Sequence, residues 1–314
     1  MQENEVKTEL PLLGENKPKK EKKLSKLGQD TALDYFLMAF LALFAFIAFY
    51  PMWYVLIGSF SNGNDYMKGG VYLFPRIFTE ANYTVVLNDD RIWQAFLVTI
   101  IRCAIGPTLL VFFTSLVAYG MSRRELPGRK GFNIYFLFTM FFSGGMVPAY
   151  LVYKLLGMLN TFWMYLIPGM LNVYDMILIR SFFKGSPEEL HEAAVIDGAG
   201  EYRIYFTIML PLCMPIIATI FLWGLIGHWN DYMTSMIYVP SRPEISSLQY
   251  VLMRIINEGD TPVMGDMSMS TQKETSSETI SYAAMVIGTL PMLIAYPFFQ
   301  KYFTKGLYVG SLKG

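Results

Sequence analysis

Six long apolar segments alternate with polar segments along the chain. A membrane-spanning helix needs roughly 20 mostly apolar residues, and residues 33–57, 93–119, 132–155, 161–183, 206–226 and 280–299 meet that requirement. Prolines within these segments predict kinked or broken helices, which are tolerated where neighbouring helices or a water-filled cavity satisfy the freed backbone groups. They are Pro51, Pro107, Pro148, Pro168, Pro211, Pro215, Pro291 and Pro297. The pattern predicts an all-α, polytopic membrane protein with six transmembrane helices.

The distribution of Lys and Arg predicts that both termini face the cytoplasm. Residues 1–32 form a polar tail with seven lysines, too polar for a cleavable signal peptide. With the tail inside, the other inner segments carry Arg123, Arg124, Arg129, Lys130 and further basic residues, whereas the longer outer loops carry few. We therefore expect a tail over 1–32 and a transmembrane domain over 33–314, with outer loops at 59–92 and 228–279. Within the second loop, residues 257–279 are rich in Ser, Thr, Met and Glu and are expected to be mobile or to contact a partner.

Composition excludes several function classes. Of the 314 residues 54% are hydrophobic and 16% charged, too apolar for a soluble domain of this size. The two cysteines and two histidines support neither a disulfide framework nor a metal site. The chain has no Gly-Lys dipeptide and therefore no Walker A loop. We expect a protein that is not an enzyme and binds no cofactor or nucleic acid.

The inner loop at 184–205 carries the most specific pattern. Ser186 with Glu189 forms a capping box and Pro187 occupies the first helical position, so a short helix is predicted from Pro187. Gly198 can take a positive φ and end it, and a second short helix follows from about Ala199. Taken alone, such a loop would most often be an amphipathic connector that lies against its own bundle.

The sequence EAAVIDGAGEYRIYFTIMLPLCMP, residues 192–215, resembles the EAA signature of permease subunits in bacterial ATP-binding-cassette importers. The similarity covers roughly residues 30–314 and is greatest to the carbohydrate-uptake branch, which includes the smaller maltose-importer permease and complex-saccharide permeases of Gram-positive bacteria. Supporting stretches are FFSGGMVP at 141–148, LNTFW at 159–163, WNDY at 229–232 and KYFTKGL at 301–307. Gly200 stands where the family usually has serine.

The resemblance implies a type I importer permease fold in the bacterial cytoplasmic membrane. It implies that the first loop helix is a coupling helix seated in a cleft of a separate ATPase, where ATP and Mg²⁺ are bound. The resemblance assigns coupling positions to this loop, and neighbouring residues of the loop are included with them. The predicted coupling residues are Glu188, Glu189, Glu192, Ala193, Ala194, Asp197 and Gly198. The implied partners are a second permease chain, expected to be a different one, two ATPase subunits and an extracytoplasmic, lipid-anchored sugar-binding protein. The implied cargo is an oligosaccharide or a polysaccharide fragment, moved by alternating access.

A sugar path needs aromatic platforms and hydrogen-bonding groups that face a cavity rather than lipid. Asp175 is the most prominent candidate because an ionisable group near a span interior is a functional candidate by default; pairing with Arg180 or Arg102 is the structural alternative. For the aromatic residues the alternative is packing or an interfacial belt position. The candidates are Tyr150, Asn172, Tyr174, Asp175, Trp223, His228, Trp229, Asn230 and Asp231.

Three other functions compete with an importer permease. A secondary, ion-coupled transporter would carry several acidic groups within its spans, and Asp175 is nearly alone. An intramembrane enzyme would need a catalytic constellation at membrane depth, which neither histidine provides. A pure scaffold would leave the coupling-loop pattern without a purpose.

Overall fold

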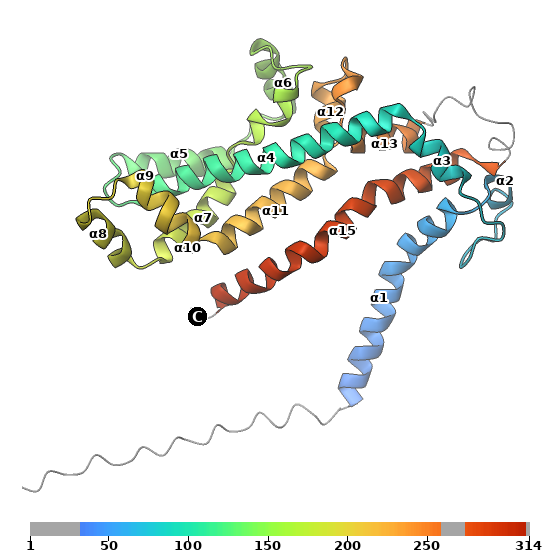
Figure 1. The fold of residues 1–314 in the computed structure, drawn as a ribbon, viewed down its shortest axis with the longest axis horizontal. Helices are drawn as coiled ribbons and strands as arrows, with labels where there is room; N and C mark the ends of the chain where they lie inside the picture. The colour runs from blue at the N-terminus through green and yellow to red at the C-terminus, as the bar shows by residue number, and fades with distance from the viewer. Residues whose placement is uncertain (1–31, 259–273, 312–314) are drawn as a thin grey trace, which may run out of the picture. The chain divides into compact units, whose positions relative to one another are not determined.

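The computed structural model describes residues 32–258 and 274–311, and these residues are almost entirely helical (Figure 1). They contain no β-strand apart from an isolated bridge between Ser61 and Phe78. The first half of the chain holds α1 (Ala32–Ser59), α2 (Gly63–Tyr66), α3 (Ala81–Leu87), α4 (Asp90–Ser122), α5 (Arg129–Phe141), α6 (Met146–Leu155), η1 (Phe162–Tyr165) and η2 (Ile167–Gly169). The second half holds α7 (Val173–Gly185), α8 (Glu188–Ile196), α9 (Glu201–Ile204), η3 (Tyr205–Met209), α10 (Leu210–Leu212), α11 (Met214–Asn230), α12 (Met233–Tyr238), η4 (Pro243–Ile245), α13 (Leu248–Glu258) and α15 (Ser277–Ser311).

The chain forms two units, Met1–Tyr50 and Pro51–Gly314, and the boundary falls at Pro51 inside α1. In the first unit, the described part of α1 is apolar on all sides, and residues such as Phe36, Leu41 and Phe44 expose more than half of their side chains. A helix that is hydrophobic all round suits a lipid environment.

Within the second unit, three of the predicted spans are bent rather than straight. Of the described helices, α1, α4 and the first part of α15 are each long and apolar enough to cross a membrane. Three further helix pairs qualify together: α5 with α6 at 113°, η1–η2 with α7 at 45°, and the segment from α9 to α10 with α11 at 83°. Six spans result if each bent pair is one span, in agreement with the six predicted.

The positions of the breaks differ in part from the prediction. Pro51, Pro107 and Pro291 lie inside continuous helices. The sharpest break, between α5 and α6, lies at Phe142–Gly145, ahead of Pro148, and Gly145 has a φ of 86°. Glycine reaches this positive-φ conformation without the strain that other residues meet. The break is therefore located at the Gly144-Gly145 pair and not at Pro148. The break before α11, in contrast, lies between Pro211 and Pro215 as expected.

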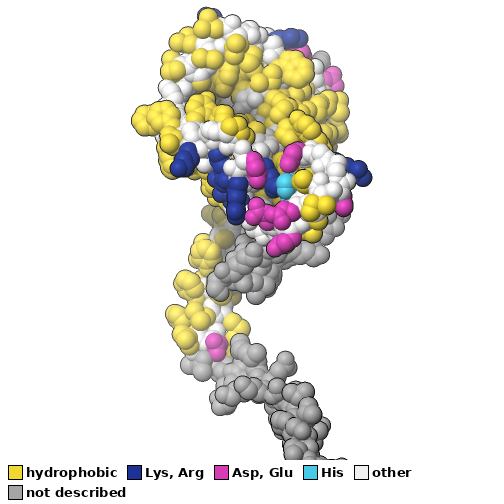
Figure 2. All heavy atoms as spheres, turned by 90° about the vertical axis from the view of Figure 1, so that its left-hand side faces the viewer, with side chains coloured by type: hydrophobic (Ala, Val, Ile, Leu, Met, Phe, Trp, Pro, Cys, Tyr) yellow, Lys and Arg dark blue, Asp and Glu magenta, His cyan; other side chains and the backbone are white. Residues whose placement is uncertain are grey.

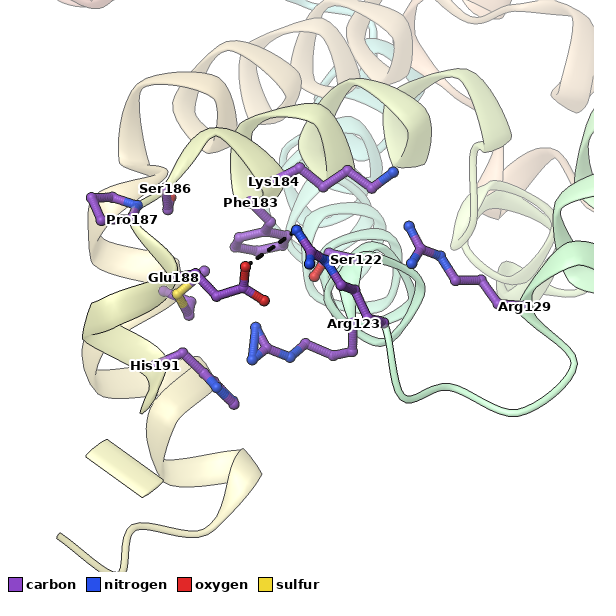
Figure 3. Close-up of a pocket in the computed structure, with 11 residues that line it drawn as sticks. Ser122, Arg123, Arg129, Phe183, Lys184, Ser186, Pro187, Glu188 and His191 are labelled. Carbon is purple, nitrogen blue, oxygen red and sulfur yellow. Dashed lines mark ion pairs between the residues drawn. The ribbon is translucent and has the colours of Figure 1, made fainter. Parts of the chain in front are cut away.

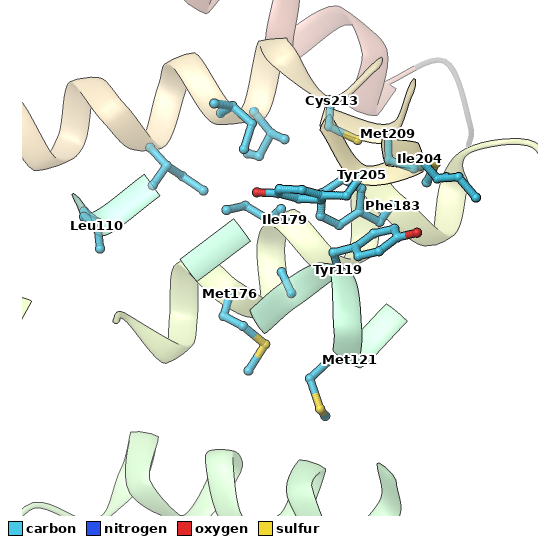
Figure 4. Packing of buried hydrophobic residues seen from close by; sticks show 14 of the residues in the cluster. Leu110, Tyr119, Met121, Met176, Ile179, Phe183, Ile204, Tyr205, Met209 and Cys213 are labelled. Atoms are coloured by element: carbon cyan, nitrogen blue, oxygen red, sulfur yellow. The ribbon is translucent and has the colours of Figure 1, made fainter. Parts of the chain in front are cut away.

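The core of the second unit lies where α4, α7 and α11 pack together (Figure 4). Ile179 and Phe183 of α7, Ile220 of α11 and Tyr119 of α4 are buried in one apolar cluster. The cluster extends to Ala194 of α8 and Ile204 of α9, so the two short loop helices share the core of the spans. The two loop helices are therefore close-packed against the bundle.

A second buried region fastens the loop at 59–92 to the start of α15. The Asn82 side chain donates to the carbonyl oxygens of Ser59 and Ser61, both at 2.9 Å, and accepts from the Thr279 hydroxyl at 2.8 Å. Asn82 and Thr279 are both fully buried, so these bonds satisfy groups that water cannot reach. The loop is thus a packed element rather than a loose connection. The expectations for the tail 1–32 and for the loop 257–279 concern mainly residues 1–31 and 259–273, which lie outside the described residues.

Candidate coupling interface and transport path

The segment from Ser186 to Arg203 forms two short helices joined by a tight turn at one end of the second unit (Figure 1). The amide nitrogens of Asp197, Gly198 and Ala199 donate to the carbonyl oxygens of Ala193, Val195 and Ala194 at 2.9–3.0 Å. Gly198 has a φ of 79°, the left-handed conformation that ends many helices. The predicted turn at Gly198 is thus confirmed.

The predicted start of the first helix is partly wrong. α8 begins at Glu188, with Pro187 as its N-cap and no side-chain capping bond. The Ser186 hydroxyl donates instead to the Phe182 carbonyl at 3.3 Å, because Ser186 directly follows α7 and completes its last turn. The second helix begins at Glu201 rather than near Ala199.

Polar contacts hold the two loop helices against the bundle. The Arg124 guanidinium pairs with the Glu188 carboxylate at 3.3 Å, across an exposed surface. The Glu201 carboxylate lies 3.1 Å from the His191 imidazole, and it also accepts a hydrogen bond from the Tyr119 hydroxyl on α4. Figure 2 shows this end of the second unit, where acidic side chains lie beside a group of Lys and Arg side chains.

The predicted coupling residues separate into an outward set and an inward residue. Glu188, Glu189, Glu192, Ala193, Asp197 and Gly198 are exposed on the described surface. Ala194 is only 8% exposed, because its methyl group packs into the core cluster beside Phe183 and Ile204. The expectation that both alanines face a partner is therefore corrected: Ala193 faces outward, and Ala194 attaches α8 to its own bundle.

Two exposed apolar residues next to these positions were not among the predicted site residues. Ile196 at the end of α8 is 85% exposed, and Tyr202 on α9 is 75% exposed. The sequence carried a signal for Ile196: the apolar residues 193–196 are consecutive, and one face of a helix cannot bury them all. Together with Ala193 they give this end exposed apolar side chains beside the exposed carboxylates of Glu189 and Glu192.

The candidate path residues lie in four separate places, one of which is the end of α11. Asn172, Tyr174 and Asp175 lie at the start of α7, where the Asn172 side chain accepts from the Asp175 amide at 3.1 Å and caps the helix. Trp223 lies midway along α11 with an exposed side chain. The Tyr150 ring of α6 stacks on that of Tyr238, with centroids 6.1 Å apart.

At the end of α11 the candidates have structural roles. Trp229 is buried, and its indole nitrogen donates to the Gly288 carbonyl on α15 at 3.0 Å, so it packs helices together instead of facing a cavity. Asp231 pairs with Arg102 at 2.5 Å. Asn230 beside them is exposed. His228 packs its ring against Gly106 of α4, where an added Cβ would lie 2.2 Å from the imidazole.

Asp175 has neither of the two partners considered for it. It is buried at 6% exposure, while Arg102 pairs with Asp231 and Arg180 donates to the Asn133 side chain on α5. Sequence reasoning did not anticipate Tyr165, whose ring lies 4.3 Å below the Arg102 guanidinium carbon. An aromatic residue in a predicted span gave no signal of that role.

The sequence of this chain is similar to those of known transport proteins. Residues 25–308 match the family described as binding-protein-dependent transport system inner membrane component. The chain is 38% identical over 287 residues to the polygalacturonan/rhamnogalacturonan transport system permease protein YtcP of Bacillus subtilis strain 168, covering 91% of this chain and 100% of the relative. It is 36% identical over 269 residues to the protein LplC of the same strain, covering 85% of this chain and 90% of the relative.

A solved structure supports the same fold. The chain resembles a subunit in the crystal structure of a bacterial ABC transporter involved in the import of the acidic polysaccharide alginate, with a TM-score of 0.78 and 31% identity. The similarity covers 87% of this chain and 97% of that subunit.

Proposed function

We propose that this chain, which belongs to the family of binding-protein-dependent transport system inner membrane components, conducts an oligosaccharide or a polysaccharide fragment across the cytoplasmic membrane. It is the permease subunit of an ATP-binding-cassette importer, not a secondary transporter. The saccharide is proposed because the relatives with more than 30% identity include proteins named for pectic polysaccharides and alginate. The similarity over the whole length of YtcP is the observation that carries this proposal.

The energy for transport would enter through α8 and α9. A separate ATPase subunit is required because the chain contains no Walker A loop. The exposed surface of Ala193, Ile196 and Tyr202 supports a helix-in-groove contact, because a small side chain lets the helix backbone approach and the apolar ones gain by burial. The acidic residues Glu189 and Glu192 would lie at the rim of that contact.

The chain would pass this motion to the membrane as a rigid body. Ala194 and Ile204 lie in the same buried cluster as Phe183 of α7 and Ile220 of α11. When two ATPase subunits close around ATP, a pull on α8 would therefore move α7 and α11 with it, and the path would open alternately to the two sides. The basic loop ends would face the cytoplasm, with an extracytoplasmic binding protein delivering cargo on the other side.

The test is ATP-dependent uptake by proteoliposomes that contain the chain with the subunits that co-purify with it. Labelled oligogalacturonides, alginate oligosaccharides and neutral oligosaccharides would be offered, each with its own binding protein. We expect uptake of at least one saccharide that stops when ATP is omitted. Uptake driven by an ion gradient without ATP, or uptake of no saccharide by a complex that transports another solute, would contradict the proposal.

A further inference from the structure

Three cavities adjoin one another where α5 and α7 meet the loop between α4 and α5. The first, about 320 Å³, is lined by Arg123, Arg124, Arg129 and Lys184 among others (Figure 3). The second, about 430 Å³, shares Lys184 and adds Arg180. The third, about 510 Å³, shares Arg124 and Arg129 with the first and Asn133 with the second. Because they share lining residues, the three cavities are direct neighbours, and together they are one basic depression in the surface.

Positive charge in this depression is not matched by carboxylates. Among the described residues that line the first cavity, Glu188 is the one that carries a carboxylate, and this carboxylate is paired with Arg124. Arg129, Arg180 and Lys184 make no ion pair with a carboxylate among the described residues. In Figure 3 the charged ends of Lys184 and Arg129 approach the same space from α7 and from the start of α5. Like charges held this close repel one another, and an anion between them would relieve the repulsion.

One further contact shapes the site. The Arg180 guanidinium donates to the Asn133 side chain, which holds it toward α5.

The second cavity supplies an apolar floor directly beside these charges. Phe136 and Leu137 of α5 face Met176 and Ile177 of α7 across it, and Leu137 is 46% exposed. A free inorganic anion gains nothing from contact with such a surface, and a hydrated sugar buries little hydrocarbon there. A hydrocarbon chain gains from every methylene group that it buries there.

We propose that this depression, which we call the basic groove (Arg129, Arg180, Lys184, Phe136, Leu137 and Met176), binds an anionic phospholipid of the cytoplasmic leaflet. The phosphate lies among Arg129, Arg180 and Lys184, and one acyl chain lies on the apolar side chains of α5 and α7. Basic pockets between transmembrane helices on the cytoplasmic side are suited to such headgroups. The assignment to the inner leaflet rests on the proposed orientation of the chain and is independent of the cargo.

The bound lipid would join α5 to α7. α7 leads directly into α8, through Ser186 and Pro187, and α7 carries Arg180 and Lys184. An anionic lipid in the basic groove would therefore hold the first loop helix and α5 in a fixed relationship and would affect the coupling of ATP hydrolysis to transport.

Native mass spectrometry of the full-length chain, purified with its co-purifying subunits and delipidated, tests the proposal. Phosphatidylglycerol or phosphatidylcholine would be added back in mixed micelles, and inorganic phosphate would be added alone. We expect retention of phosphatidylglycerol and a higher temperature of unfolding with that lipid only. Equal retention of phosphatidylcholine, or equal stabilisation by inorganic phosphate, would overturn the proposal.

Two kinds of variant separate headgroup from chain binding. Phosphatidylglycerol binding should weaken about fivefold in each of the variants Arg129→Gln, Arg180→Gln and Lys184→Gln. This is the change in affinity expected when one basic residue near an anionic headgroup is lost. The matched control is Arg203→Gln, which removes an exposed charge outside the basic groove. Leu137→Trp keeps every charge and fills the acyl position, so it should also reduce retention, whereas Leu151→Trp on α6 should not. Unchanged retention in both groups, or displacement of phosphatidylglycerol by an acidic oligosaccharide, would contradict a lipid site.

Discussion

The Arg102 guanidinium on α4 lies 2.5 Å from the Asp231 carboxylate, which directly follows α11 and is 129 residues away in the chain. Arg102 is 1% exposed, and it also donates to the Asp231 carbonyl at 3.3 Å and covers the Tyr165 ring. The Tyr165 hydroxyl in turn bonds to the Ser235 hydroxyl and the Ile245 carbonyl. Arg102 thereby connects α4 to the end of α11. Through the Tyr165 ring of η1, it is also connected to the short helices α12 and η4.

Replacing Asp231 by Asn should destabilise the protein, because it leaves the Arg102 charge buried without a counter-ion. Breaking one side of a buried pair costs about 3–5 kcal/mol, and the lower end is expected because the Asp231 side chain is 23% exposed. The measurement is the thermal unfolding midpoint in detergent. The matched control is Glu244→Gln, which breaks the exposed Arg242–Glu244 pair at 2.6 Å and should shift the midpoint little. Equal shifts in the two variants would show that burial of the pair contributes nothing.

This ion pair also marks what the sequence could not predict. Trp229 and Asp231 are candidate path residues in the sequence because an indole offers an aromatic platform and a carboxylate offers a hydrogen-bonding group. Their roles as partners of Arg102 and Gly288 depend on contacts between segments 129 and 59 residues apart. Hydrophobic patterning carries no information about which distant group a side chain meets, so the coupling loop was predicted better than the path.

Local chemistry predicted the spans and the turn, with specific exceptions. α4 and α15 follow from long apolar runs, and the turn at Gly198 follows from the freedom of glycine to take a positive φ. The break at Gly144-Gly145 was misplaced to Pro148 because a proline near the start of a helix is compatible with that helix. The capping box at Ser186 failed because α7 ends at Gly185 and uses the serine.

Gly198→Val should abolish uptake while the ATPase subunit still binds. Valine at a φ of 79° is strained by about 1–2 kcal/mol or more, although no atom would obstruct its Cβ, so the turn rather than the packing would change. We expect ATP hydrolysis that no longer produces uptake. Gly200→Val is the matched control, because Gly200 has an ordinary φ of −73° and open space around it. Normal uptake by a fully assembled Gly198→Val protein would contradict a lever that depends on this turn.

Ala193→Glu and Ala194→Glu should fail for different reasons. Ala193 is exposed, so its variant should keep the thermal unfolding midpoint of the parent and lose the co-purifying ATPase subunit. Ala194 is buried against Phe183 and Ile204, so a carboxylate there should lower the midpoint because burying an unpaired charge is costly. Gel filtration and thermal unfolding of both variants make the comparison. A stable Ala193→Glu protein that retains its ATPase would argue against α8 as the contact.

Gly106→Ala should disturb the packing of α4 against α11 where Gly106 meets His228. A Cβ at this position would lie 2.2 Å from the His228 ring, so either the ring would have to turn away or α11 would have to shift. Such overpacking costs about 1–3 kcal/mol. Gly120→Ala on the same helix meets no atom within 4 Å, and it should be neutral or stabilise α4 by up to about 1 kcal/mol through helix propensity. Thermal unfolding midpoints of the two variants give the comparison. A Gly106→Ala protein as stable as Gly120→Ala would mean that the His228 ring or α11 can make room at this contact without cost.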